Sequence, residues 1–231
     1  KALSESDVVI PCFIFDPRQV GTKNTYRSMY AIQFMIESLK DVMDQLKARG
    51  GRLYLLYGNA HEMVEKLIKQ EKIDAVFVNQ DYTPFSVQRD EQINKICMHY
   101  DAQFVSCHDA LLTEPYQVLT VGNVPYSVYT PFFKNASKIL VPKPQTVPRV
   151  CGFYTKTIKL AESKTIFKEI LPKQNKDVWV HGGTEHAKKI LKNLKKFKNY
   201  AKERDYPALD ATTHLSAHNK FGTVSIRAVY H

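Results

Sequence analysis

The stretch VVIPCFIFDP, residues 8–17, decides the fold class of this chain of 231 residues. It is a continuous apolar run that ends in Asp16 and Pro17. A run without polar alternation is typical of a strand buried on both faces of a parallel sheet, and proline cannot continue a ladder of hydrogen bonds. We therefore predict a buried parallel strand that ends at Pro17.

Strands and helices are predicted to alternate after this stretch. Short apolar runs predict three more strands, at residues 52–58, 75–79 and 103–107. Apolar residues at helical spacing predict three helices, at residues 26–49, 59–72 and 86–100. The alternation implies βαβ units, so we predict an α/β fold with a Rossmann-like parallel sheet flanked by helices. Neither a GxGxxG fingerprint nor a P-loop occurs in the sequence.

The pattern changes after residue 109. Residues 118–136 predict a hairpin around Gly122 and Asn123, followed by a short helix. Residues 141–150 contain three prolines and are the best candidate for a linker. A weak helix is predicted at residues 159–169.

A basic helix is predicted at residues 183–203, with Thr184 as its N-cap and Glu185 in its first turn. Its central sequence KKILKNLKKFK, residues 188–198, concentrates part of the formal net charge of +10. A basic surface suits nucleic acid or another polyanion. On charge pattern alone, a solvated helix face is the alternative.

Composition and cysteine spacing indicate a globular intracellular protein. The chain is 44% hydrophobic and 24% charged, it has no long apolar run that could span a membrane, and its start lacks the pattern of a signal peptide. Cys12, Cys97, Cys107 and Cys151 lie far apart and form no CxxC pair. This spacing argues against a metal site and for reduced thiols, hence a cytoplasmic location. Cys12 and Cys97 are predicted to fill the core.

Residues 200–216, YAKERDYPALDATTHLS, are the most distinctive stretch outside the predicted sheet. Thr212, Thr213 and Ser216 place three hydroxyls just before a segment that can open a helix. Hydroxyls and backbone N–H groups at a helix start suit a phosphate, and Tyr200 and Arg204 upstream add further donors. An ordinary N-cap that binds nothing is the alternative.

This stretch, preceded by WVHGGTEHA, resembles the entry to the flavin-binding domain of the DNA photolyase/cryptochrome family. The blocks IPCFIFDP, AIQFMIESLKDV, VNQDYTPFSVQRD and VPYSVYTPFFK resemble the amino-terminal α/β antenna domain of photolyases, in the same order. The resemblance implies that Arg204 contacts DNA. It implies FAD contacts at Tyr200, Thr212, Thr213, His214, Leu215 and Ser216, with His214 standing where Arg or Lys is commoner.

The resemblance also implies a domain organisation. Residues 1–135 would form the α/β antenna domain without its first strand, which in the family precedes this region. Residues 136–182 would form an interdomain linker, and residues 183–231 would begin an all-α FAD-binding domain that continues in the family for roughly the same length again. We therefore expect this chain to be a fragment that is inactive by itself and contains no catalytic residue.

The function implied by the resemblance is that of a blue-light-dependent deoxyribodipyrimidine photolyase, a carbon–carbon lyase. Such an enzyme is a monomer that repairs UV-damaged DNA by electron transfer from reduced FAD. A cryptochrome photoreceptor without repair activity is the closest alternative. A stand-alone α/β nucleotide-binding module is a second alternative, but it leaves residues 200–216 unexplained.

A second, antenna chromophore is implied without its identity. Folate-binding members carry an Asn-Glu pair where this chain has Phe85 and Ser86, so the folate pattern is not matched. Asp81 follows the strand predicted at residues 75–79. Ligands bind at such carboxyl edges of open sheets, but a carboxylate that caps a turn is an equally good interpretation.

Overall fold

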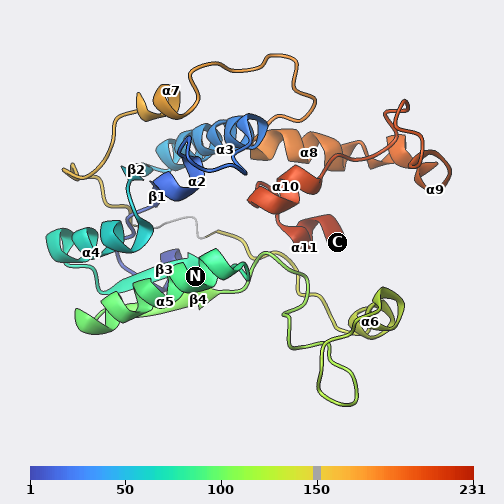
Figure 1. Ribbon diagram of the computed structural model, residues 1–231, viewed down its shortest axis with the longest axis horizontal. Helices are drawn as coiled ribbons and strands as arrows, with labels where there is room; N and C mark the ends of the chain where they lie inside the picture. The colour runs from blue at the N-terminus through green and yellow to red at the C-terminus, as the bar shows by residue number, and fades with distance from the viewer. Residues whose placement is uncertain (148–151) are drawn as a thin grey trace.

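The computed structural model describes residues 1–147 and 152–231 and confirms an α/β fold. The four predicted strands are β1 (Cys12–Phe15), β2 (Tyr54–Tyr57), β3 (Ala75–Asn79) and β4 (Gln103–Cys107). Within the described ranges they form two parallel pairs, β1 with β2 and β3 with β4, rather than the single continuous sheet that was predicted. Figure 1 shows the two pairs at different levels, joined through helices.

The strand β1 ends as its sequence predicted. Asp16 follows it and caps the short helix α2 (Pro17–Val20), because its carboxylate accepts the backbone N–H of Arg18 at 2.9 Å. The proline occupies the first helical position, where its missing N–H costs nothing.

Helices cover the first pair of strands on both faces, as predicted. Phe15 and Leu55 face α3 (Met29–Ala48), where they join Ile32, Ile36 and Leu39 in one buried cluster. The alternate residues of the same strands face the other way, toward α4 (Ala60–Glu71) and α5 (Pro84–His99). This period of two is the side-chain alternation of a strand.

The predicted linker packs against the α/β core instead of running free. Val9 pairs with Phe153 and Leu55 pairs with Glu162 through isolated bridges. The helix predicted at residues 159–169 is shorter and later: it is α7 (Ile166–Ile170), whose apolar residues enter the cluster beneath α3. Residues 148–151, which belong to the interdomain linker predicted at residues 136–182, lie outside the described residues.

The prediction of one long basic helix at residues 183–203 is wrong. The chain forms α8 (Thr184–Lys192), a 3-10 turn η1 (Leu194–Phe197) and α9 (Tyr200–Glu203). The break falls at Asn193, whose side-chain amide donates to the carbonyl of Lys189 at 2.9 Å and so competes with the helix ladder. Repulsion among closely spaced lysines opposes a continuous helix there as well.

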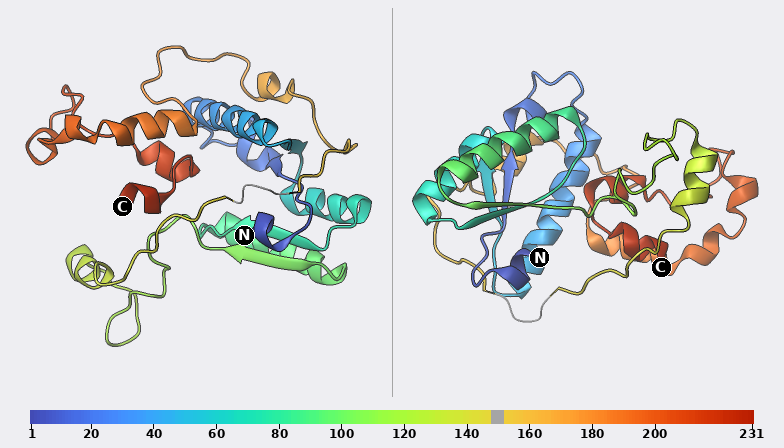
Figure 2. Two further views of the ribbon diagram at one scale, coloured as in Figure 1. Left: turned by 180° about the vertical axis from the view of Figure 1, so that it is seen from behind. Right: turned by 90° about the horizontal axis from the view of Figure 1, so that it is seen from below.

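The remaining elements are α1 (Ala2–Glu5), α6 (Tyr129–Ala136), α10 (Ser216–Phe221) and α11 (Ile226–Tyr230). The predicted turn before α6 is present, with Asn123 at a φ of 56° and the N–H of Thr120 bonded to the carbonyl of Val124 at 2.9 Å. An isolated antiparallel bridge between Leu119 and Pro125 flanks it in place of the two predicted hairpin strands. In Figures 1 and 2, α6 and this turn lie apart from the helices around the strands. Over the described ranges, every helix is too short or too polar to cross a membrane.

One polar face of α3 holds the backbone that leads into α8. The buried side chain of Gln33 bonds both backbone groups of Asn175, accepting its N–H and donating to its carbonyl, each at 2.8 Å. One turn later, the Glu37 carboxylate accepts the N–H of Gly182 at 2.7 Å. These bonds satisfy backbone groups that no secondary structure serves.

The start of α8 is capped from α3, and the prediction of Thr184 as N-cap is wrong. Gly183 is the N-cap residue, with a φ of 102°, and Thr184 is the first helical residue. The N–H of Gly183 bonds the Ser38 hydroxyl at 3.1 Å, and the N–H of Thr184 bonds the Asp41 carboxylate at 2.8 Å. A carboxylate at this position also complements the positive end of the helix. Glu185 lies in the first turn, as predicted.

We predict that Gly182→Ala destabilises the fold by about 1–3 kcal/mol, the usual range for overpacking. A Cβ at this position would lie 2.2 Å from the carbonyl oxygen of Phe34 and 2.5 Å from the Ser38 hydroxyl, so α3 and the segment before α8 would have to separate. Thermal unfolding followed by circular dichroism measures the change.

Gly122→Ala is the matched control, because nothing lies closer than 3.9 Å to a Cβ at that position. Equal melting temperatures for the two variants would contradict the assigned close approach of α3 to Gly182.

Candidate functional site

Tyr200 and Arg204 lie one turn apart on the same side of the chain. The Arg204 guanidinium lies over the Tyr200 ring, 5.8 Å from its centroid, and both side chains are partly exposed. The alternative partner of Arg204, Asp205, is 3.7 Å away and 79% exposed. An exposed ion pair at that distance contributes little to stability, so the arginine keeps donors available for a ligand.

The segment between α9 and α10 is fixed by Asp210. Its carboxylate pairs with the Lys196 ammonium and with Nε2 of His214, the latter at 3.1 Å. Hydrogen bonds from Lys196 and then from His214 hold the pKa of Asp210 below its usual value. The indole of Trp179 packs edge-on against the His214 ring at 5.7 Å. Trp179 is 76% exposed, so its ring contacts the loop rather than a core.

The backbone of His214 is in the left-handed region, with a φ of 52°. Such a conformation is uncommon for a residue other than glycine and persists where surrounding contacts enforce it. Here the neighbours Ala211 and Leu215 are buried and the His214 ring is held by Asp210 and Trp179. The backbone on either side of His214 is therefore held in one conformation.

The hydroxyls of Thr212, Thr213 and Ser216 are not used by the fold. In the part of the chain that the structure describes, none of the three makes a hydrogen bond with another protein group. The N-cap of α10 is Leu215, and no side chain caps that helix. The interpretation of these hydroxyls as ordinary caps is therefore wrong, and all three are free to bind a ligand.

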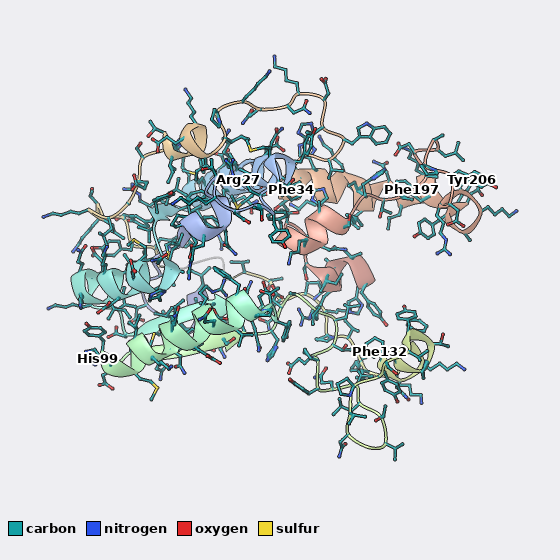
Figure 3. All side chains as sticks on the ribbon, viewed as in Figure 1. Arg27, Phe34, His99, Phe132, Phe197 and Tyr206 are labelled. Carbon is teal, nitrogen blue, oxygen red and sulfur yellow. The ribbon has the colours of Figure 1, made fainter. Side chains whose placement is uncertain are left out.

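A buried histidine beneath this loop was missed by the sequence analysis. His218 on α10 is fully buried, packs edge-on against Phe34 at 5.1 Å, and bonds the Thr223 hydroxyl through Nδ1 at 2.7 Å. Burial, together with the nearby His186, lowers its pKa. Its only sequence signal is its place three residues after Leu215, on the same side of a helix. Figure 3 labels Phe34 on α3, beside α10.

The lysine-rich stretch presents a mainly unpaired basic surface. Lys188 pairs with Glu185 at 2.8 Å, and Lys196 pairs with Asp210. Over the described ranges, no ion pair involves Lys192, Lys195, Lys198 or Lys202. This surface, which begins in α8 and continues into α9, lies next to Arg204 in the sequence and suits a polyanion.

A large cavity of about 1190 Å³ lies between the strand pairs and extends to the carboxyl ends of β3 and β4. At that edge the Tyr82 hydroxyl bonds Nδ1 of His108 at 2.9 Å, and Nε2 of His108 lies 3.7 Å from the Glu114 carboxylate. Arg227 of α11 pairs with Asp109 at 2.9 Å and closes the same side. The volume exceeds that of ordinary small-ligand pockets.

Asp81 serves the turn at this edge, which fits its interpretation as a turn-capping carboxylate. Its carboxylate accepts the N–H groups of Tyr82 and Thr83 and the hydroxyl of Ser86, at 2.7, 3.2 and 3.1 Å. Partial burial raises its pKa, but these hydrogen bonds outweigh that effect and lower it. Ser86 is itself buried in this turn, and Phe85 lies under the Arg18 guanidinium at 4.8 Å. The two positions of the folate pattern are therefore occupied by a turn residue and a cation–π partner.

The model of the DNA photolyase family matches residues 1–149 of the chain. The chain belongs to the DNA photolyase/cryptochrome family. Its resemblance to that family, derived from several separate blocks, is thereby confirmed.

The relatives of the chain include both photolyases and cryptochromes. A deoxyribodipyrimidine photo-lyase of Alkalihalophilus pseudofirmus is 30% identical over 95% of this chain and 46% of its own length. Cryptochrome-1 of Drosophila melanogaster is 29% identical over 99% of this chain and 47% of its own length. The chain thus spans about half the length of these relatives.

A solved photolyase-family structure extends the match through the hydroxyl-bearing loop. The crystal structure of an archaeal photolyase from Sulfolobus tokodaii with two FAD molecules superposes with a TM-score of 0.84 at 34% identity. The superposition includes 99% of this chain and 49% of the archaeal photolyase chain. The family model ends at residue 149, so the likeness of residues 200–216 rests on these full-length relatives.

Proposed function

We propose that the protein carrying this chain is a blue-light-dependent deoxyribodipyrimidine photolyase that binds FAD at the loop between α9 and α10. The observation that carries this proposal is the set of three hydroxyls, Thr212, Thr213 and Ser216, that no protein group occupies although the loop is fixed on both sides. The match at this loop indicates the class of ligand, because the archaeal photolyase structure that covers the loop contains two FAD molecules.

The residues present fit the phosphate end of a flavin dinucleotide. The three hydroxyls can donate to anionic oxygens, and Tyr200 offers a further hydroxyl donor from α9. His214 and Leu215 set the backbone of the turn, through a left-handed φ and a buried side chain. When bound, the flavin supplies the light-driven electron, while this chain binds and orients it.

DNA binding is assigned to Arg204 and the adjacent lysines. A guanidinium that is partly exposed and weakly paired can form a forked contact to a phosphate. The unpaired lysines add attraction that depends on salt rather than on sequence. A damaged base pair costs less free energy to open than an intact one. A lesion therefore leaves the duplex to reach a buried cofactor more easily than an undamaged base does.

A cryptochrome photoreceptor is the second candidate, supported by the match to the Drosophila protein over 99% of this chain. Repair of a pyrimidine-dimer substrate by the full-length protein under blue light separates the two. A flavin-containing protein without repair would favour photoreception.

A second chromophore belongs to this proposal, at the carboxyl edge of β3 and β4. That edge holds the stacked pair of Tyr82 and His108, and the cavity there is large enough for a flavin-sized molecule.

We further propose residues 1–135 as the antenna domain, residues 136–182 as the connection and residues 183–231 as the start of the FAD-binding domain. The protein would act as a cytoplasmic monomer on UV-damaged DNA.

This chain by itself is expected to bind FAD weakly, with a Kd above about 10 µM, or about 7 kcal/mol of binding free energy at most. Tyr200 and Arg204 are about half exposed, and the cavity of about 1190 Å³ is lined by no residue of the loop. Trp179, the only tryptophan, contacts His214, so quenching of its emission measures binding. Stoichiometric binding at low micromolar FAD would favour the stand-alone nucleotide-binding module instead.

In the full-length protein, Thr212→Val with Ser216→Val should reduce the flavin retained on purification. Each lost hydrogen bond to a charged oxygen costs about 1.5–3 kcal/mol. The ratio of flavin to protein absorbance measures the loss. Ser137→Val is the control, because that hydroxyl bonds only the carbonyl of Lys134 at the end of α6. Full flavin occupancy in the double variant would contradict the phosphate role.

Arg204→Ala in the full-length protein should leave flavin content unchanged and weaken binding of dimer-containing DNA. The slope of log affinity against log salt should fall by about one unit, because one phosphate contact is lost. Arg204→Lys should recover only part of the affinity, since an ammonium cannot make the forked contact. A lowered melting temperature with unchanged affinity and salt slope would instead assign Arg204 to the fold.

A further inference from the structure

A small hollow of about 340 Å³ lies between α3 and α7, and we call it the lysine hollow. In Figures 1 and 2, α7 lies beside α3 on the side away from β3 and β4. The apolar residues of α7 enter the buried cluster beneath α3, so the two walls of the hollow are held together by the core. The lining residues are Lys40, Met43 and Asp44 on one wall, and Lys164, Phe167 and Lys168 on the other.

The lining residues follow helical spacing on both walls. Lys40 is followed by lining residues three and four positions later, and so is Lys164. Residues at these intervals share one face of a helix. Lys164 precedes the first residue of α7, but its carbonyl accepts the N–H of Phe167 at 3.3 Å, so the helical turn already begins there. The two segments therefore direct the same kinds of side chain into one space.

The floor of the hollow is apolar. Phe167 is only 6% exposed, because its ring packs edge-on against Phe15 at 6.1 Å and lies under the Lys40 ammonium at 5.9 Å. Met43 is half-buried against the same cluster, and a flexible thioether adapts to side chains of different shape. The floor can accept an apolar side chain, but the buried ring offers little free face on which a nucleic-acid base could stack.

The rim of the hollow carries more positive than negative charge. Lys40, Lys164 and Lys168 are exposed, and in the part of the chain that the structure describes none of them forms an ion pair. Asp44 is the one carboxylate among the lining residues. Three ammonium groups around one hollow repel one another, and an anionic partner relieves that repulsion.

The segment on either side of Lys164 extends this positive surface. The acidic residues of the segment 156–176 are Glu162 and Glu169, and the Glu169 carboxylate accepts a hydrogen bond from the Thr165 hydroxyl at 3.4 Å. The lysines of the segment outnumber them and are all exposed: Lys156, Lys159, Lys164, Lys168, Lys173 and Lys176. Their combined field attracts an acidic partner over a range of about 10 Å at 0.1 M salt.

The donors of the hollow suit carboxylates better than a phosphate. The N–H groups of Phe167 and Lys168 bond the carbonyls of Lys164 and Thr165, so they form no cradle for a phosphate. The ammonium groups that remain are point charges without the fork of an arginine. Because the rim is exposed, an occupant is covered on one side only, whereas small ligands are mostly buried in their sites. A side chain of a larger partner fits this geometry.

We propose that the lysine hollow docks an acidic segment of a partner protein, which inserts one apolar side chain between Met43 and Phe167. Carboxylates on either side of that apolar residue then meet Lys40, Lys164 and Lys168. A volume of about 340 Å³ lies near the lower limit for ligand sites and suits one side chain rather than a cofactor.

The lysine hollow is separate from the sites proposed above. Its lining residues belong neither to the loop between α9 and α10 nor to the lysine-rich stretch at residues 188–202, and they line no part of the cavity of about 1190 Å³. Cys12, which was predicted to fill the core, is instead exposed and lines that larger cavity. The docking proposal therefore does not depend on flavin or DNA binding.

Binding is tested on the full-length protein with a fluorescein-labelled peptide of about ten residues, aspartate and glutamate around one central phenylalanine, followed by anisotropy. The same peptide with alanine at its centre keeps the charge but loses the apolar contact, and should bind about tenfold more weakly. Equal affinities of the two peptides would show diffuse attraction to a basic protein and overturn the proposal.

Lys164→Glu with Lys168→Glu should weaken binding of the phenylalanine peptide by about tenfold, because attraction becomes repulsion at two positions. Lys164→Gln with Lys168→Gln should produce a smaller loss in the same direction. Lys66→Glu with Lys95→Glu is the matched control, since it makes the same change of charge at exposed lysines of α4 and α5. Equal losses in the two Glu variants, both folded by circular dichroism, would exclude the hollow as the binding site.

Asp44→Asn tests the same contact with the opposite sign. It removes a negative charge that faces the acidic segment, so the affinity should rise by about twofold. An unchanged or lower affinity would contradict the placement of carboxylates at the rim. A double-stranded oligonucleotide is the competing polyanion: if it displaces the peptide and Lys164→Glu with Lys168→Glu weakens its own binding, the hollow binds nucleic acid and the proposal fails.

Discussion

The arrangement of the carboxyl-terminal half depends on the capture of backbone by the polar face of α3. Gln33, Glu37, Ser38 and Asp41 lie on successive turns of that helix and bond the backbone of residues 175–184. The bonds to Glu37 and Asp41 are made to carboxylates and are therefore among the stronger ones a neutral N–H can form. They fix where α8 begins and in which direction it leaves α3.

Two glycines make this capture possible, for different reasons. Gly182 allows the backbone to approach α3 closely, since a side chain there would overlap the Phe34 carbonyl. Gly183 adopts a φ of 102°, which an L side chain rarely adopts. The contact is thus specified jointly by small residues on one segment and short polar residues on the other.

The hydroxyl-bearing loop inherits its position from the same helix. Phe34, on α3 between Gln33 and Glu37, packs against His218 and Phe221 of α10, and so places the residues just before that helix. From the other side, Trp179 and Asp210 hold His214. A loop fixed at both ends can keep three hydroxyls unpaired at little cost, because they remain accessible to water until a ligand replaces it.

The sequence by itself determined the α/β class, the order of the strands and helices, and the family. The strands at residues 75–79 and 103–107 were predicted with their observed bounds, because periodicity and turn residues are local properties. The six flavin-contact positions and Arg204 came from resemblance, and they stay predictions. Only the tertiary structure decided that the hydroxyls of Thr212, Thr213 and Ser216 are free, because capping depends on where a helix begins. The helix α10 begins at Ser216, and Leu215 is its N-cap residue. The tertiary structure also decided the break in the basic helix at Asn193, the capping of α8 by Asp41, and the division of the strands into two pairs. Each of these depends on partners far away in the sequence or on competition between nearly equal local states, and a linear pattern records neither.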